Sequence, residues 1–149
     1  MKNHPLNLYS INNFQKQVKE KLGEWLHNFE WDIWCTFTFR FAVKNPFNAK
    51  KYFERFNKNL NRNISYFIGI ENFKTSDNVH IHALLEGVKD ITYVQLGQIW
   101  YKPYGYAYIR KYDPKLGASY YITKYVTKEF CDWDIHFRSN SQLGLNLVN

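Results

Sequence analysis

The spacing of hydrophobic residues changes repeatedly along the chain, and each change predicts a different element. From Ser10, a residue type that caps helices, apolar side chains recur every three or four positions, which predicts an amphipathic helix over residues 10–29. Residues 32–41 alternate between polar and apolar positions, which predicts a strand with a buried phenylalanine face. Helical spacing returns over residues 47–60, after an Asn-Pro pair.

The rest of the chain is predicted to form a hairpin and further helices and strands. Two strand-like segments, residues 65–72 and 78–86, are separated by the polar segment FKTSD, which predicts a β-hairpin. The other predicted elements are helices at residues 91–100 and from Pro114 to about residue 130, and strands at residues 104–112 and at CDWDIHF. This mixture predicts an α+β fold with a mainly antiparallel sheet of about five strands and flanking helices. With no linker-like stretch, residues 1–149 are expected to form a single domain.

Composition adds a basic and aromatic character to this fold. Twenty Lys and Arg oppose thirteen Asp and Glu, a formal charge of +7, and they are interleaved with 12 Tyr, 12 Phe and 5 Trp. Positive charge attracts phosphates, and unpaired bases stack on aromatic rings, so this combination favours a partner that is single-stranded nucleic acid. The alternative is an ordinary basic protein whose composition has no functional meaning.

Composition also narrows the setting of the protein. The chain is too apolar for a disordered protein, at 45% hydrophobic residues, and its apolar runs are too short for a membrane span. The N-terminal sequence has no apolar signal region. The two cysteines, Cys35 and Cys131, have no CxxC spacing, which fits a reducing compartment and excludes a cysteine-rich zinc site. A soluble, cytoplasmic protein is therefore expected.

The segment NVHIHALLEG places two histidines on one predicted strand. Alternation puts His80 and His82 on one face and the apolar residues between them on the other. If the hairpin closes symmetrically, Glu71 on the preceding strand lies across from His80, with Cβ atoms roughly 5 Å apart. Two imidazoles and a carboxylate can hold a divalent cation and leave positions open. Alternatively, the histidines are solvent-facing sheet residues and Glu71 is a charge at the hairpin end.

The predicted helix after Pro114 contains the segment KLGASYYITKYVTKEF. Helical spacing places Tyr121, Tyr125 and Lys128 on one face, beside an apolar seam that suits packing on the sheet. Tyrosines and a lysine would then project together from the helix edge. The alternative is an aromatic stripe in the core with solvated lysines.

The order of these segments, WCTFTFR, IEN, HIH and YITKYVTKE, resembles the ordered motifs of HUH endonucleases, the rolling-circle replication initiators. The resemblance spans about residues 34–137 and implies a catalytic core at about residues 31–137, with a ferredoxin- or RRM-like sheet. It implies that His80, His82 and Glu71 bind Mn²⁺ or Mg²⁺. It also implies that a helix tyrosine attacks DNA.

The tyrosine motif occurs here in two overlapping copies, which is similar to the two-tyrosine motif of phage gene A initiators. Tyr125 with Lys128 fits the way single-tyrosine initiators continue, so Tyr125 is the expected nucleophile, and Tyr121 stays a candidate. Lys128 and Lys124 are candidates for stabilising phenolate or phosphate charge, although Lys124 also fits a solvated helix position. The chain contains no Gly-Lys-Ser/Thr phosphate loop of a helicase.

The resemblance implies sequence-specific nicking and joining of single-stranded DNA through a covalent 5′-phosphotyrosine, which would start rolling-circle replication of a plasmid, phage or small virus. The expected partners are an origin stem-loop and the host replication helicase and polymerase, with the chain itself a monomer. Residues on the open sheet face are candidates for base stacking and phosphate contact. They are Thr36, Thr38, Arg40, Tyr106, Tyr108, Arg110 and Lys111.

Three other functions fit parts of the same pattern. A single-tyrosine HUH transposase uses the same chemistry in a chain of similar length. A non-catalytic RNA-binding module with an aromatic sheet would make the histidines incidental. A non-haem iron oxygenase also uses two histidines and a carboxylate, but the basic aromatic surface and the tyrosine helix argue against it.

Overall fold

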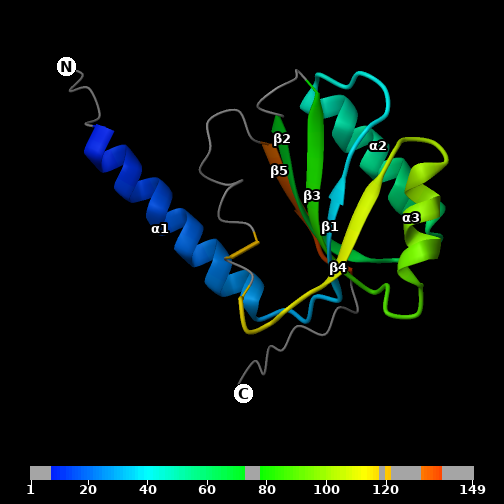
Figure 1. The fold of residues 1–149 in the computed structure, drawn as a ribbon. Coiled ribbons are helices and arrows are strands. Elements are labelled where there is room, and N and C mark those ends of the chain that lie inside the picture. Colours follow the sequence, from blue (N-terminus) through cyan, green and yellow to red (C-terminus); the bar gives the residue numbers. More distant parts are fainter. Residues whose placement is uncertain (1–7, 73–77, 118–119, 122–131, 139–149) are drawn as a thin grey trace.

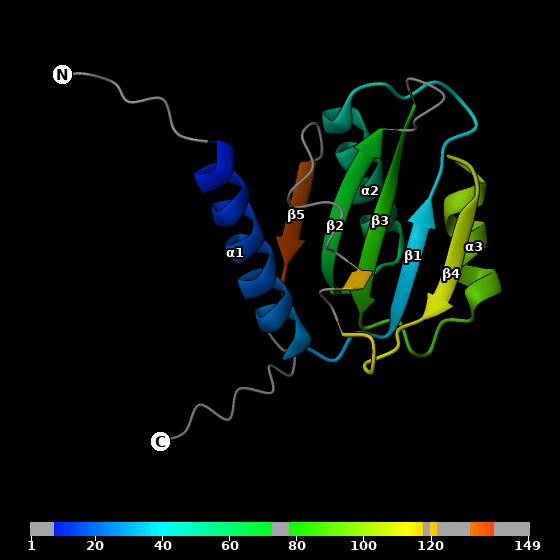
Figure 2. The ribbon, with the colours of Figure 1, turned by 60° about the vertical axis from the view of Figure 1, so that its left-hand side comes forward.

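A five-stranded antiparallel sheet forms the centre of the molecule (Figure 1). The computed structural model describes residues 8–72, 78–117, 120–121 and 132–138. Its strands lie in the order β4-β1-β3-β2-β5, and every neighbouring pair is antiparallel (Figure 2). This arrangement confirms the predicted α+β class. The strands are β1 (Ile33–Phe37), β2 (Ser65–Asn72), β3 (Val79–Glu86), β4 (Ala107–Lys111) and β5 (Asp132–His136).

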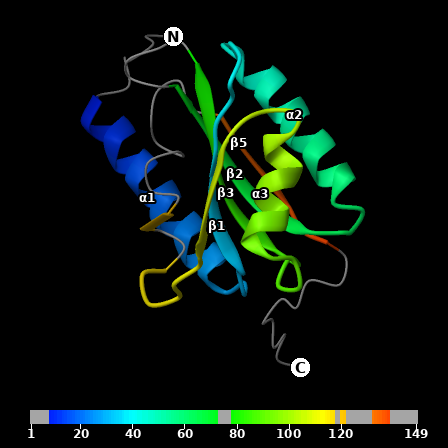
Figure 3. The ribbon, with the colours of Figure 1, turned by 45° about the vertical axis from the view of Figure 1, so that its right-hand side comes forward.

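Three helices flank the sheet, two on one side and one on the other (Figure 3). They are α1 (Leu8–His27), α2 (Pro46–Asn59) and α3 (Tyr93–Tyr101), and α2 and α3 share a side. Local sequence fixes where α2 and α3 begin. The side chain of Asn45 caps α2, with Pro46 in its first turn, and Thr92 with Gln95 forms a reciprocal capping box on α3.

The main hydrophobic core lies between the sheet and helices α2 and α3. The predicted alternation of β1 is confirmed, because Cys35 and Phe37 are fully buried on this side. The ring of Phe37 packs against Phe56 and Trp100, with centroids 5.2 and 4.6 Å apart. Burial raises the pKa of the Cys35 thiol well above its usual range, so this cysteine is a core residue and not a reactive thiol.

A smaller cluster lies on the other side of the sheet, where the end of α1 packs. Leu26 from α1 and Phe29 just beyond it meet Phe67 of β2 and Leu84 of β3. Earlier in the helix, Phe14 is 67% exposed, so the apolar series predicted for residues 10–29 contacts the sheet mainly through its last turns. This side of the sheet is the one that carries the two histidines.

The predicted helix from Pro114 is wrong at its start. Residues 114–116 form a turn, in which the Asp113 side chain accepts a hydrogen bond from the Lys115 N–H at 2.9 Å. Gly117 follows with φ +76°, a left-handed conformation that ends a turn and interrupts a helix. Helix is present at residues 120–121, and residues 122–131 lie outside the described residues.

The predicted strand over residues 104–112 is also shorter than expected, since β4 begins at Ala107. Pairing with the first strand continues before it through two backbone bonds, from Thr38 N to Tyr106 O and from Arg40 N to Tyr104 O. A Cβ on Gly105 would lie 2.4 Å from the Thr38 carbonyl oxygen, so only glycine fits between these segments. Among the helices that the structure describes, none has the length and apolar character needed to cross a membrane.

Candidate metal centre and nucleic-acid face

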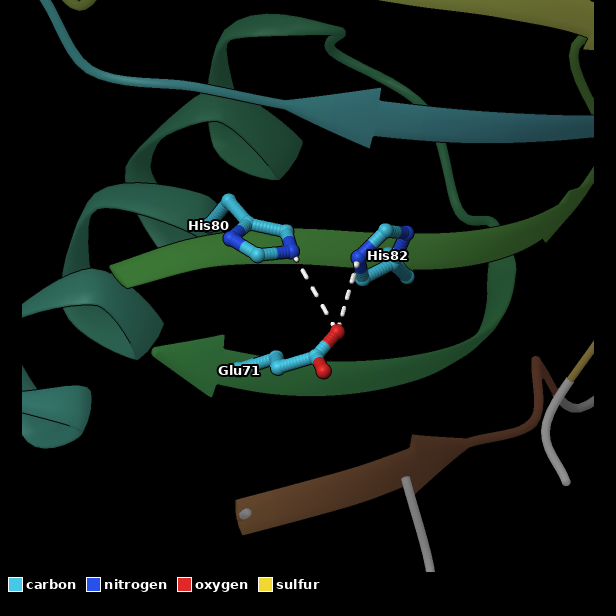
Figure 4. Close-up of side chains that lie close together, drawn as sticks. All are labelled: Glu71, His80 and His82. Atoms are coloured by element: carbon cyan, nitrogen blue, oxygen red, sulfur yellow. Dashed lines mark ion pairs between the residues drawn. The ribbon is translucent and has the colours of Figure 1, made fainter. Parts of the chain in front are cut away.

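Two imidazoles and a carboxylate meet on the α1 side of the sheet (Figure 4). Glu71 of β2 is directly opposite His80 of β3 in the antiparallel register, which confirms the predicted pairing. One carboxylate oxygen, Glu71 Oε2, lies 3.3 Å from His80 Nε2 and 3.5 Å from His82 Nε2 (Figure 4). The three side chains converge because β3 alternates, and the short hairpin aligns it with β2.

Further side chains hold His82 in this orientation. The hydroxyl oxygen of Thr36, on β1, lies 3.2 Å from His82 Nδ1, within hydrogen-bond distance. The indole of Trp34, two residues earlier on the same strand face, stacks on the imidazole with centroids 5.3 Å apart and planes 15° apart. A hydrogen bond at one ring nitrogen leaves the other nitrogen, Nε2, turned towards Glu71 and suited to bind a metal.

The donor set of this site fits a divalent cation. One ligand atom from each of Glu71, His80 and His82 can be chosen so that all three lie within 4.8 Å of one another. The side chains are 11 to 15% exposed, so they are largely shielded but not sealed from solvent. Imidazole nitrogens with one carboxylate oxygen suit first-row divalent metals, and three protein ligands leave room for others.

Of the tyrosine-motif residues, only Tyr121 lies within the described part of the chain. Its side chain is buried beside Trp34, with ring centroids 5.2 Å apart, and Trp34 in turn contacts His82. The Tyr121 hydroxyl accepts a hydrogen bond from the Asp113 N–H at 3.1 Å. The other predicted catalytic residues, Lys124, Tyr125 and Lys128, lie outside the described residues.

Some of the predicted DNA-binding residues form a stripe on β4 beside the triad. Tyr108 is paired with Thr36, which is paired in turn with His82. Tyr106 is 61% exposed and Tyr108 is 44% exposed. The Arg110 guanidinium lies over the Tyr108 ring, 4.6 Å from its centroid. Aromatic surface and positive charge are therefore adjacent to the candidate metal centre.

The other predicted DNA-binding residues do not join this stripe. Arg40 donates hydrogen bonds to the Tyr101 and Lys102 carbonyls at the end of α3, where it acts as a helix cap. Thr38 donates to the Tyr106 carbonyl oxygen at 3.1 Å, and so ties two segments together. Alternation places Lys111 on the α2 and α3 side of β4, away from Tyr108 and Arg110.

Sequence reasoning missed the contact that Trp34 makes with His82. Alternation along residues 32–41 put Trp34 on the open face together with Thr36. It could not reveal which strand lies beside β1, because the β1–β3 pairing joins residues 46 positions apart, as between Thr36 and His82. Thr36 was accordingly predicted to contact DNA rather than a histidine.

Comparison with known proteins supplies the family. The model of the replication-associated protein ORF2 family matches residues 32–130, which are 99 of the 149 residues. This range includes β1 to β4 and all three residues of the candidate metal centre. No curated protein and no solved structure matches the chain. The match covers most of the chain, which therefore belongs to the replication-associated protein ORF2 family and is related to replication initiators.

Proposed function

We propose that the protein is an HUH-type endonuclease that nicks and rejoins single-stranded DNA at a replication origin. In this proposal Glu71, His80 and His82 hold Mn²⁺ or Mg²⁺, and a tyrosine forms a covalent 5′-phosphotyrosine. The observation that carries the proposal is the convergence of both His Nε2 atoms on one Glu71 oxygen, in a chain of a replication-associated family. Family membership favours a replication initiator over a transposase or an oxygenase.

The triad provides what a phosphodiester needs before a tyrosine can attack it. A phosphodiester is anionic and repels a phenolate, and a phenol with a pKa near 10 is mostly protonated at neutral pH. The chemistry that a divalent cation supplies at such a site is neutralisation and polarisation of the phosphate. Glu71, His80 and His82 would fix the cation, and Thr36 would hold the His82 ring in the required orientation.

The covalent step transfers the phosphoryl group from DNA to the protein. The tyrosine hydroxyl oxygen loses its proton and attacks phosphorus, the bond from phosphorus to the 3′ oxygen breaks, and that oxygen leaves as a 3′-hydroxyl. The phosphate then links the tyrosine to the 5′ end, and the reverse reaction rejoins the strand. Lys128 and Lys124, which lie in the same sequence motif, would balance the charge on the phenolate or phosphate.

We favour Tyr125 as the nucleophile over Tyr121. The Tyr121 ring is buried in the hydrophobic cluster beneath α1, and its hydroxyl accepts a backbone hydrogen bond from Asp113. These contacts suit a structural tyrosine that supports Trp34 next to the triad. Tyr125, four residues later in the repeated motif, then has the catalytic role.

The direct test is a denaturing gel of the protein mixed with Mn²⁺ and single-stranded hairpin oligonucleotides from its own replicon. We expect a protein–DNA band that survives SDS, is absent with EDTA, and is lost in Tyr125→Phe. Tyr121→Phe should retain the band, since the phenyl ring keeps its packing beside Trp34. An adduct formed in full by Tyr125→Phe would move the nucleophile to Tyr121, and absence of any adduct would refute the nuclease.

A non-catalytic module that binds single-stranded nucleic acid is the second candidate. The exposed stripe of Tyr106, Tyr108 and Arg110 favours it, because such a surface binds nucleic acid without any chemistry. This module would bind oligonucleotides equally well after Glu71→Ala and would give no cleavage with any metal.

A further inference from the structure

A groove runs between α3 and the edge strand β4, which lie side by side in Figures 2 and 3. Its volume is about 430 Å³, and its lining includes Tyr93, Val94 and Tyr101 from α3 and Tyr106 and Tyr108 near β4. We call it the α3–β4 groove. Each of these five side chains is exposed, from 44% for Tyr108 to 69% for Val94. Clustered exposed aromatic rings are rare on a surface that has no partner.

The charge around this groove is of one sign. Residues 91–112 contain Lys102, Arg110 and Lys111 but no Asp or Glu, and they include six of the twelve tyrosines. Two guanidinium groups lie over tyrosine rings at its margin, Arg40 at 5.1 Å from the Tyr101 centroid and Arg110 at 4.6 Å from that of Tyr108. Rings for base stacking and cations for phosphates thus occur together.

The two edges of the sheet differ in charge, which distinguishes the possible routes across it. The β5 edge carries Asp132 and Asp134, and the Asp134 carboxylate pairs with Lys50 at 3.1 Å. The β4 edge carries Arg110 and Lys111 and no carboxylate. A polyanion that reaches the triad is repelled less at β4 than at β5.

From these observations we infer that the α3–β4 groove binds unpaired nucleotides that flank the scissile phosphate, so that the strand crosses the sheet over β4. The role of these nucleotides as flanks of a cleaved site rests on the proposed function. The affinity of the groove for single-stranded nucleic acid does not, because stacking and phosphate contacts require neither a metal nor a nucleophile. Tyr108 connects the two regions, since it lines the groove and is paired with Thr36 beside His82.

Charge substitution at Val94 tests the groove without disturbing the fold. Val94 is the second residue of α3, where a glutamate stabilises the helix through its dipole, so weaker binding by Val94→Glu cannot be attributed to unfolding. The probe is a fluorescein-labelled oligothymidylate of about 16 nucleotides, titrated with the full chain in EDTA by fluorescence anisotropy. We expect Val94→Glu to weaken binding at least about fivefold, and Val94→Lys to match or exceed the unmodified chain.

Stacking is tested separately with Tyr101. We expect Tyr101→Ala to weaken binding about fivefold or more, and Tyr101→Phe to retain it, because stacking needs the ring and not the hydroxyl. The matched control is Phe47→Ala on α2, since Phe47 is 60% exposed and lies 4.5 Å below the Lys51 ammonium, yet does not line the groove. Its affinity should be unchanged.

The outcomes separate this inference from the proposed function. Wild-type affinity in both Val94→Glu and Tyr101→Ala would overturn the groove, whether or not DNA is nicked. If a dimer in sedimentation becomes monomeric in Val94→Glu while oligonucleotide binding is unchanged, the groove is a contact between copies and the inference is wrong. If the groove variants bind weakly but no adduct ever forms with Mn²⁺, the groove stands and the nuclease fails.

Discussion

The position of His82 depends on two side chains that do not bind metal themselves. Thr36 contacts its Nδ1 from one side, and Trp34 stacks on the ring. A partner at Nδ1 fixes which nitrogen carries the proton, and therefore keeps Nε2 available beside Glu71. The candidate metal centre thus extends to β1, although its three ligands lie on β2 and β3.

Replacing Thr36 by valine should weaken metal binding without removing a ligand. Valine has nearly the shape of threonine but no hydroxyl, so we expect the Kd for Mn²⁺ to rise about tenfold or more, and Thr36→Ser to restore most of the affinity. Calorimetric titration measures both. The control is Thr38→Val, because the Thr38 hydroxyl bonds to the Tyr106 carbonyl and not to a histidine. Equal affinity in Thr36→Val and the unmodified chain would remove Thr36 from the site.

At the scale of elements, local pairings were predictable from the sequence and distant ones were not. The β2–β3 hairpin closes over a short polar segment, so the Glu71–His80 pairing follows from the symmetry of the turn. The order of all five strands depends on contacts between distant segments, which alternation does not encode. The helix predicted from Pro114 failed because Asp113 and Gly117 stabilise a turn there, a local signal that helical spacing does not include.

The start of β4 provides a test of backbone packing between elements. Alanine at Gly105 would place its Cβ against the Thr38 carbonyl oxygen and 2.9 Å from the Arg40 nitrogen, which are backbone atoms that cannot rotate away. We expect Gly105→Ala to lower the free energy of unfolding by about 2 kcal/mol, measured by chemical denaturation.

The matched control for this prediction is a glycine with room around it. A Cβ at Gly97 of α3 would meet only Ile109 Cδ1, at an ordinary 3.9 Å. Alanine is favoured over glycine in a helix by about 1 kcal/mol, so Gly97→Ala should stabilise the protein. Similar stability changes of the same sign in the two variants would contradict the close approach at Gly105.

Stability of the whole molecule should fall at alkaline pH. Burial raises the pKa of Tyr66 and of Tyr112 to about 12, chiefly because a phenolate is poorly solvated in the core. Since each pKa is higher in the folded state than in the unfolded chain, the stability these phenols contribute is complete below about pH 10 and is lost as the pH rises towards 12. Thermal unfolding at a series of pH values measures this loss.

Tyr112→Phe separates one phenol from the other. The Tyr112 hydroxyl is buried and has no hydrogen-bond partner among the described residues, so its removal should leave stability at neutral pH unchanged or higher. Above pH 10 the variant should lose less stability than the unmodified chain. An identical alkaline loss in both proteins would show that Tyr112 does not contribute to it.

The whole account depends on a metal bound by Glu71, His80 and His82, and a calorimetric titration of Mn²⁺ into the metal-free chain tests this directly. We predict one ion per chain, with affinity at least about tenfold weaker in Glu71→Ala and unchanged in Asp132→Ala, which removes an exposed carboxylate on β5. Absence of Mn²⁺ binding by the unmodified chain, or equal binding by Glu71→Ala, would contradict the metal centre and the nuclease proposed from it.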